Sequence, residues 1–166
     1  MPCIKQIALL ALLLCHGGSA ATIIVVRHAD RMSGMSANAL LSPAGEERAR
    51  QLADVLKDAN IQRIYVTEVR RTQQTAEPLA ERLHRKPIVI AKKDMDKLVN
   101  QLQNLGANET VLVVGHADTV PEIVERLGGG PVAAMRDDEY DRMMVVYTGA
   151  GGKTRPLTLR YGKPSP

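Results

Sequence analysis

Short apolar runs rich in β-branched residues alternate along this chain with stretches in which apolar residues recur at helical spacing. Each run is too short for a helix and is typical of a strand that is buried on both faces. The stretches between the runs carry a single apolar stripe, as helices that cover a sheet do. Because strands and helices alternate, the sequence predicts right-handed strand–helix–strand units. We therefore expect an α/β fold with an open, mostly parallel sheet and helices on both faces.

Local signals place the individual helices and strands. Ser42 can cap a helix, Pro43 suits its first position, and Glu46 favours the positive end of its dipole. We expect this helix to end near Asn60. Further helices are predicted over 76–83, 95–105 and 121–127. Strands are predicted at 22–26, 64–66, 88–90, 110–114, 143–147 and 157–161, the last two around a glycine-rich turn at 149–152.

The first 20 residues have the pattern of a secretory signal. Lys5 is the only charged residue before an unbroken apolar run at 7–15, and small residues follow the run. Cleavage after Ala20 or Ala21 would leave a single domain over residues 21–166 that is exported, to the periplasm or out of the cell. The run is too short for an ordinary membrane span, so none is expected. An N-terminal core helix is the alternative interpretation.

Composition argues against several classes of chemistry and partner. Both cysteines, Cys3 and Cys15, lie in the signal segment, so we expect no disulfide and no cysteine metal site in the remainder. Loss of Lys5 would lower the formal net charge from +4 to +3, and the basic residues are interleaved with acidic ones. With no Phe and no Trp, the chain lacks the aromatic platforms on which nucleic-acid bases stack. We expect no nucleic-acid partner.

Two of the predicted buried strands end in a histidine. The first strand runs into Arg27 and His28, and the fourth runs through a glycine into His116. Arg71 follows the second strand. Because ligand sites of open α/β sheets lie at the carboxyl ends of the strands, these four side chains are expected to meet in one crevice. Arg31 lies at the mouth of this crevice or on the surface, and Arg70 is expected to be a solvated helix residue.

The side chains of this crevice suit a phosphoryl group. Planar guanidinium groups bind phosphate oxygens, and they can do so bidentately. A histidine can attack phosphorus and carry the phosphoryl group covalently. A second, protonated histidine can offset the charge on the group in transfer. No acidic cluster of the kind that holds Mg²⁺ is evident, so the chemistry is expected to need neither metal nor cofactor.

Four segments of the chain resemble a known family, and they occur in the family's order. They are Arg27-His28-Ala29, Leu41 to Gly45, Thr67 to Ala80, and Val113 to His116. Together they are similar to the signature segments of the histidine phosphatase superfamily, which has the phosphoglycerate-mutase-like fold. The resemblance extends over nearly all of residues 22–147.

The resemblance implies a role for each site residue. His28 would be the nucleophile that becomes phosphohistidine, and Arg27 and Arg71 would clamp the phosphoryl oxygens. His116 would be a second phosphate ligand, and water would hydrolyse the intermediate without a metal. The implied activity is a metal-independent phosphohydrolase that cleaves phosphomonoesters or phosphohistidine. Its substrate would be a small phosphorylated molecule or a phosphoprotein.

The sequence departs from the family in its general acid. Many members have an acidic residue directly after the second histidine or in a segment after the second helix. Here Asp118 lies two places beyond His116 and is the tentative acid, while Asp94 and Asp96 lack the family's surrounding pattern. Two alternatives stay open: a catalytically inactive phosphate- or phosphosugar-binding protein of the same fold, and a phosphomutase. The short chain argues against the mutase.

Overall fold

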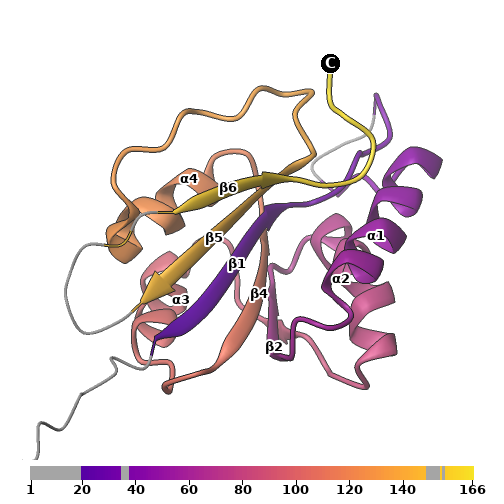
Figure 1. The fold of residues 1–166 in the computed structure, drawn as a ribbon. Coiled ribbons are helices and arrows are strands. Elements are labelled where there is room, and N and C mark those ends of the chain that lie inside the picture. Colours follow the sequence, from indigo (N-terminus) through magenta and orange to yellow (C-terminus); the bar gives the residue numbers. More distant parts are fainter. Residues whose placement is uncertain (1–19, 35–37, 149–153, 155) are drawn as a thin grey trace, which may run out of the picture.

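The computed structural model describes residues 20–34, 38–148, 154 and 156–166 (Figure 1). The predicted signal segment, apart from Ala20, and the predicted glycine-rich turn at 149–152 lie outside the described residues. Within the described part of the chain, no helix is both long enough and apolar enough to cross a membrane.

The described residues form one sheet of six strands in the order β3-β2-β4-β1-β5-β6. Strand β1 pairs in parallel with β4, and β2 pairs in parallel with both β4 and β3, whereas β5 and β6 are antiparallel to their neighbours. The expectation of an open, mostly parallel sheet is therefore confirmed. The strands are β1 (Ala21–Arg27), β2 (Ile61–Val66), β3 (Ile88–Val89), β4 (Thr110–Gly115), β5 (Arg142–Thr148) and β6 (Leu157–Arg160).

Helices cover both faces of the sheet, as expected (Figure 1). They are α1 (Pro43–Leu56), α2 (Arg70–Arg82), α3 (Met95–Gln103) and α4 (Thr119–Val124), the last continued by a π-helical segment η1 (Glu125–Gly129). Alternate residues of β1 enter separate cores because successive side chains of a strand point to opposite faces. Ile24 and Val26 pack with α1 and α2, and Ile23 and Val25 pack with α3 and α4.

The junction between the first helix and the second strand differs from the prediction. Helix α1 ends at Leu56, before Asn60, and Asn60 itself has a positive φ of 51°. Asparagine tolerates this left-handed conformation better than most residues, and it lies directly before β2. Strand β2 consequently begins at Ile61, three residues earlier than predicted.

The start of α1 is docked on the loop that follows β1. The Ser42 hydroxyl caps the helix by accepting a hydrogen bond from the Gly45 amide at 3.2 Å, as the sequence predicts. The Ser42 amide also donates to the Asp30 carbonyl at 2.9 Å. A Cβ atom at Gly45 would lie 2.0 Å from that same carbonyl oxygen, so only glycine allows this approach.

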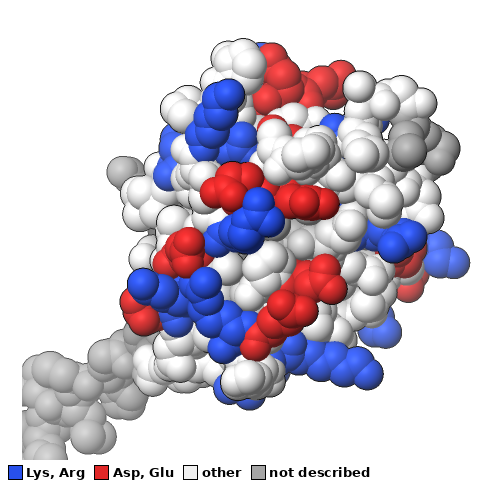
Figure 2. All heavy atoms as spheres, turned by 90° about the vertical axis from the view of Figure 1, so that its right-hand side faces the viewer, with Lys and Arg blue, Asp and Glu red and all other residues white. Residues whose placement is uncertain are grey.

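The face of the molecule formed by α1 and α2 carries charges of both signs. Figure 2 shows Lys and Arg side chains interspersed with Asp and Glu side chains on this side. Arg82 of α2, for example, pairs with Asp54 of α1 at 2.6 Å. This face therefore presents a mixed charge to solvent, as expected from the interleaved sequence.

Candidate active site

The two strand-end histidines lie side by side at the carboxyl edge of the sheet. Arg27 and Gly115 are register partners in the parallel β1–β4 pair, and the His28 amide continues the ladder by donating to the Gly115 carbonyl at 2.9 Å. The next residues, His28 and His116, are brought together with ring centroids 5.4 Å apart. Their exposed fractions are only 3% and 4%. The sequence prediction that they share one crevice is consistent with this geometry.

One ring nitrogen of His28 is engaged in a hydrogen bond within the protein, which determines the tautomer of the ring. Its Nδ1 lies 2.8 Å from the carbonyl oxygen of Ala29, which can only accept a hydrogen bond, so Nδ1 carries the proton. Burial, together with the nearby charges of Arg71 and Arg27, lowers the pKa of His28 to about 3. At neutral pH the imidazole is therefore uncharged, with the lone pair on Nε2. This is the form that can attack phosphorus.

His116 is held in the opposite tautomer by a chain of hydrogen bonds. A guanidinium can only donate, so the 3.3 Å contact between Arg71 Nη2 and His116 Nδ1 makes Nδ1 the acceptor. The Nε2 proton then goes to the Thr67 hydroxyl at 3.1 Å. Thr67 can donate in turn to the Thr72 hydroxyl at 3.0 Å, which donates to the Val69 carbonyl at 2.8 Å. The order of donors and acceptors is consistent throughout.

The charge state of His116 differs from the expected protonated histidine. Burial, and then the charges of Arg71 and Lys92, lowers the pKa of His116 to about 4. The residue is therefore neutral at pH 7. Positive charge at the site comes from the guanidinium groups.

Arg71 is positioned by the start of α2. The Thr75 hydroxyl donates to the Arg71 carbonyl at 2.7 Å and accepts from the Ala29 amide at 2.9 Å, which ties the helix to the residue after His28. Burial, and then the charge of Arg31, lowers the pKa of the Arg71 guanidinium. Arg31 is exposed, and its charge also acts on the pKa of Arg27. Arg31 thus belongs to the mouth of the site.

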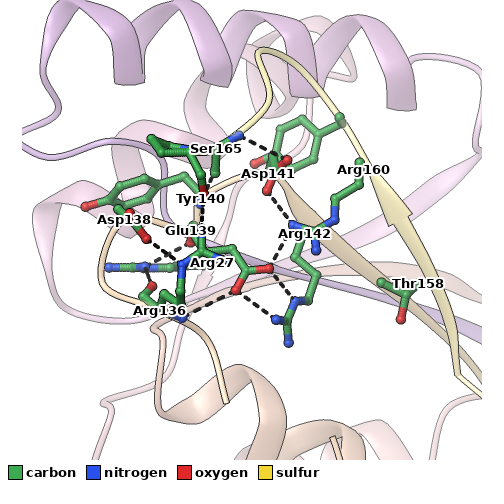
Figure 3. Close-up of polar contacts among 12 residues, drawn as sticks. Arg27, Arg136, Asp138, Glu139, Tyr140, Asp141, Arg142, Thr158, Arg160 and Ser165 are labelled. Atoms are coloured by element: carbon green, nitrogen blue, oxygen red, sulfur yellow. Dashed lines mark hydrogen bonds and ion pairs between the residues drawn. The ribbon is translucent and has the colours of Figure 1, made fainter. Parts of the chain in front are cut away.

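Arg27 uses most of its donors within the protein. Its Nη1 donates to the carbonyls of Arg136 at 2.7 Å and Glu139 at 2.9 Å, and its Nη2 donates to that of Asp137 at 3.0 Å (Figure 3). Three of the five N–H groups of the guanidinium are thus used within the protein, and the clamp that the sequence suggests is left to the others. Its Nε is buried and has no hydrogen-bond partner among the described residues. A buried donor of this kind is rare in native proteins, and it can donate to a bound ligand or water.

Asp118, the tentative acid, is held by contacts at the surface of the molecule. Its carboxylate forms an ion pair with Lys92 at 2.7 Å, caps α4 through the Thr119 amide at 3.0 Å, and is largely exposed. Partial burial acts to raise the pKa of Asp118, but the hydrogen bond and charge of Lys92 bring it below the ordinary value. The carboxyl group is therefore ionised at neutral pH, and its tentative assignment as acid stays a prediction.

The other acidic candidates lie elsewhere. Asp94 is exposed at the start of α3, and Asp96 pairs with Arg126 at 2.6 Å on the surface. Asp30 binds the buried Arg48 at 2.6 Å, which is a structural ion pair.

Sequence reasoning missed Thr67, Thr72, Thr75 and Tyr140 as parts of the site. The three threonines lie within the segment after β2 that was singled out for Arg71, so that segment held the signal. The Tyr140 ring centroid lies 4.1 Å from the Arg27 Cζ and 6.0 Å from the His28 ring. The one indication of Tyr140 in the sequence is the rarity of aromatic residues, since the chain has four Tyr and no Phe or Trp.

The described residues thus combine an α/β sheet with two histidines and two arginines at its carboxyl edge. The model of the histidine phosphatase superfamily (branch 1) matches residues 11–94, half of the chain. The chain belongs to this superfamily, as the four sequence segments indicate. No curated protein matches the sequence.

Solved structures share the fold. A protein histidine phosphatase SixA complexed with tungstate has a TM-score of 0.67 and 21% identity, covering 84% of this chain and 96% of that chain. A mycobacterial glucosyl-3-phosphoglycerate phosphatase has a TM-score of 0.64 and 14% identity, covering 86% and 98%. A phosphoglycerate mutase from Plasmodium falciparum has a TM-score of 0.59 and 19% identity, covering 89% and 94%. The phosphoglycerate-mutase-like fold is thereby confirmed.

Proposed function

We propose that the protein is a phosphohydrolase that acts through a covalent phospho-His28 intermediate. The observation that carries this proposal is the buried, neutral His28 imidazole, whose Nδ1 proton is engaged by the Ala29 carbonyl and whose Nε2 lone pair is available. Superfamily membership and the similarity to phosphatase structures support the same reaction class.

In the first step, His28 Nε2 attacks phosphorus and forms a phosphorus–nitrogen bond. The bond to the leaving group breaks, and the leaving group departs with the bonding electron pair. The imidazole becomes cationic, and its Nδ1 proton stays hydrogen-bonded to the Ala29 carbonyl, which stabilises the positive charge. In the second step, water attacks phosphorus, the phosphorus–nitrogen bond breaks, and inorganic phosphate is released with neutral His28.

The cations of the site stabilise the phosphoryl oxygens during both steps. The Nε–H of Arg27 is buried and, among the described residues, has no protein acceptor, so it is suited to donate to one oxygen. Arg71 supplies a second guanidinium at the same edge of the sheet. A phosphoryl dianion would compete with His116 for the Arg71 donor. Its negative charge would also raise the pKa of His116, whereas the charges of Arg71 and Lys92 lower that pKa.

The contacts of the carboxylates near His116 bear on which leaving groups the site can release. Asp118 and Glu68 act on the pKa of His116, yet both are exposed and both bind Lys92, through Nζ at 2.7 Å and the amide at 2.8 Å. Because each of these carboxylates is engaged with Lys92, the site favours groups that leave without protonation. We therefore propose phosphorus–nitrogen and aryl phosphate bonds as substrates in preference to alkyl phosphates, in keeping with the similarity to a protein histidine phosphatase.

The test is release of phosphate from p-nitrophenyl phosphate in the presence of EDTA. His28→Asn should lower kcat by at least about a thousandfold, because the nucleophile is lost. His84→Asn is the matched control, since His84 is exposed at the end of α2 and its φ of 51° suits asparagine. Normal turnover by His28→Asn would contradict the proposal. Phosphate binding by the wild-type protein without any turnover would favour the non-catalytic binding protein instead.

A further inference from the structure

Tyr140 lies where its ring can orient the Arg27 guanidinium, a hydrogen-bond donor for a phosphoryl group. Its ring is stacked on the guanidinium of Arg27, with 4.1 Å between the ring centroid and Cζ (Figure 3). The same ring is a neighbour of His28, with 6.0 Å between centroids. Tyr140 is half-buried, whereas Arg27 and His28 are almost fully buried. The tyrosine is thus the outermost of the three side chains.

The orientation of the Arg27 guanidinium has two determinants. Three carbonyl oxygens, from residues 136, 137 and 139, fix its edge by accepting its terminal N–H groups. Hydrogen bonds in the guanidinium plane leave the face of the group open, and Tyr140 covers that face. Aromatic faces attract guanidinium groups, most strongly where water is excluded. The carbonyl oxygens at the edge of the guanidinium and the ring on its face together determine where its Nε–H points.

The backbone at Tyr140 is fixed by its own hydrogen bond and by the ion pairs of the residue that precedes it. Its amide donates to the Ser165 hydroxyl at 2.8 Å (Figure 3). The preceding residue, Glu139, is 2% exposed and forms ion pairs with Arg142 at 2.8 Å and Arg160 at 2.7 Å. The ring therefore occupies its place through the backbone and its neighbours. No hydrogen bond of its hydroxyl group is needed to explain the position.

We propose that Tyr140 is a positioning residue for phosphoryl binding, which acts through its ring by fixing Arg27 so that Nε–H donates to a phosphoryl oxygen. This inference rests on the proposed phosphohydrolase function. It assigns to the ring face, and not to the hydroxyl group, the contribution of Tyr140 to the site.

The experiment compares Tyr140→Phe with Tyr140→Leu, using inorganic phosphate as the binding probe and p-nitrophenyl phosphate as substrate. Tyr140→Leu should weaken phosphate binding and raise KM by about tenfold, as expected for loss of a desolvated cation–π contact, with a smaller change in kcat. Tyr140→Phe should retain wild-type binding. Tyr140→Met, which keeps a long, flexible apolar side chain without the ring, gives the same comparison if the leucine variant does not fold.

Tyr147→Leu is the matched control. Tyr147 is 49% exposed and pairs with Thr22, at the opposite end of β1 from the site, so its replacement should leave phosphate binding unchanged. Wild-type binding by Tyr140→Leu would overturn the inference alone, as would equal weakening in Tyr140→Phe, because the hydroxyl group would then be responsible. Absence of both binding and turnover in the wild-type protein would instead overturn the proposed function, and the inference with it.

Discussion

The two histidines at the sheet edge are neutral and hold opposite tautomers. His28 keeps its proton on Nδ1 because a backbone carbonyl accepts it, which leaves the lone pair on Nε2, the atom that we propose as the nucleophile. His116 keeps its proton on Nε2 because Thr67 accepts it and Arg71 donates to Nδ1. One imidazole is thus arranged for attack and the other to orient a guanidinium. The Ala29 carbonyl decides the tautomer of His28, and Arg71 and Thr67 together decide that of His116.

Burial of neutral histidines makes the stability of the protein depend on pH. The pKa of His28 is about 3 and that of His116 about 4 in the folded protein, both below the ordinary 6.5. The unfolded chain therefore binds more protons between pH 6.5 and pH 4, and the free energy of unfolding should fall as pH falls through this range. For His28 the upper limit is about 1.4 kcal/mol per pH unit.

Urea unfolding at a series of pH values measures this dependence. In His28→Asn the slope of the unfolding free energy against pH should be smaller than in the wild-type protein, since one titrating group is removed. Equal slopes in the two proteins would contradict the depressed pKa of His28.

Thr67→Val should disturb His116 without changing the shape of the side chain much. The substitution leaves the Nε2 proton of a residue that is 4% exposed without its acceptor. The expected cost is about 1–3 kcal/mol of unfolding free energy, with weaker phosphate binding. Thr67→Ser keeps the hydroxyl and should behave as the wild type. If the valine variant matched the wild type in both stability and binding, the proposed hydrogen-bond chain would be wrong.

At the scale of elements, the docking of α1 on the residues after β1 shapes the approach to the site. The Asp30 carbonyl accepts from Ser42, and its carboxylate pairs with Arg48 of α1. The absence of a side chain at Gly45 lets the helix approach this carbonyl. The segment from Leu41 to Gly45, noted in the sequence for its family resemblance, therefore has a packing reason for its glycine.

Gly45→Ala tests this packing. Alanine is preferred over glycine in helices by about 1 kcal/mol, but a Cβ atom 2.0 Å from the Asp30 carbonyl forces the backbone apart. Overpacking of this kind costs about 1–3 kcal/mol, so we expect net destabilisation in urea unfolding. Gly106→Ala is the control, because its Cβ would meet only the flexible Glu109 carboxylate at 3.2 Å. A Gly45→Ala protein as stable as the wild type would refute the close approach.

The sequence predicts most strands well, both at the centre of the sheet and at its edges. The predicted bounds of β1, β4, β3 and β6 lie within one residue of those in the structure, because each strand contains a run of β-branched or other apolar residues. Strand β2 lies inside the sheet but begins three residues earlier than predicted, because Gln62 and Arg63 interrupt its apolar pattern. Helix caps such as Ser42 were also predictable, because the signal is local.

At the scale of the whole molecule, the site joins parts of the chain that no local pattern connects. The four basic side chains could be predicted to meet, because each follows a recognisable strand. The partners of Arg27 could not, since they lie 109 to 112 residues away in a segment without helical or strand periodicity. The ion pair of Asp118 with Lys92 could not be predicted either, because the two residues are 26 positions apart and nothing in the sequence pairs them.

Export of the domain stays a prediction from the first 20 residues. Expression in a bacterial host, followed by mass measurement of the protein recovered from the periplasm, would test it. Cleavage after Ala20 or Ala21 is the expected result.

The covalent intermediate is the central claim, and rapid-quench mass spectrometry tests it most directly. Wild-type protein mixed with excess p-nitrophenyl phosphate and quenched in alkali should carry one acid-labile phosphoryl group on the peptide that contains His28. His28→Asn should carry none, and His84→Asn should carry as much as the wild type. Turnover with no phosphoryl adduct at any quench time, or an adduct on a residue other than His28, would contradict the account.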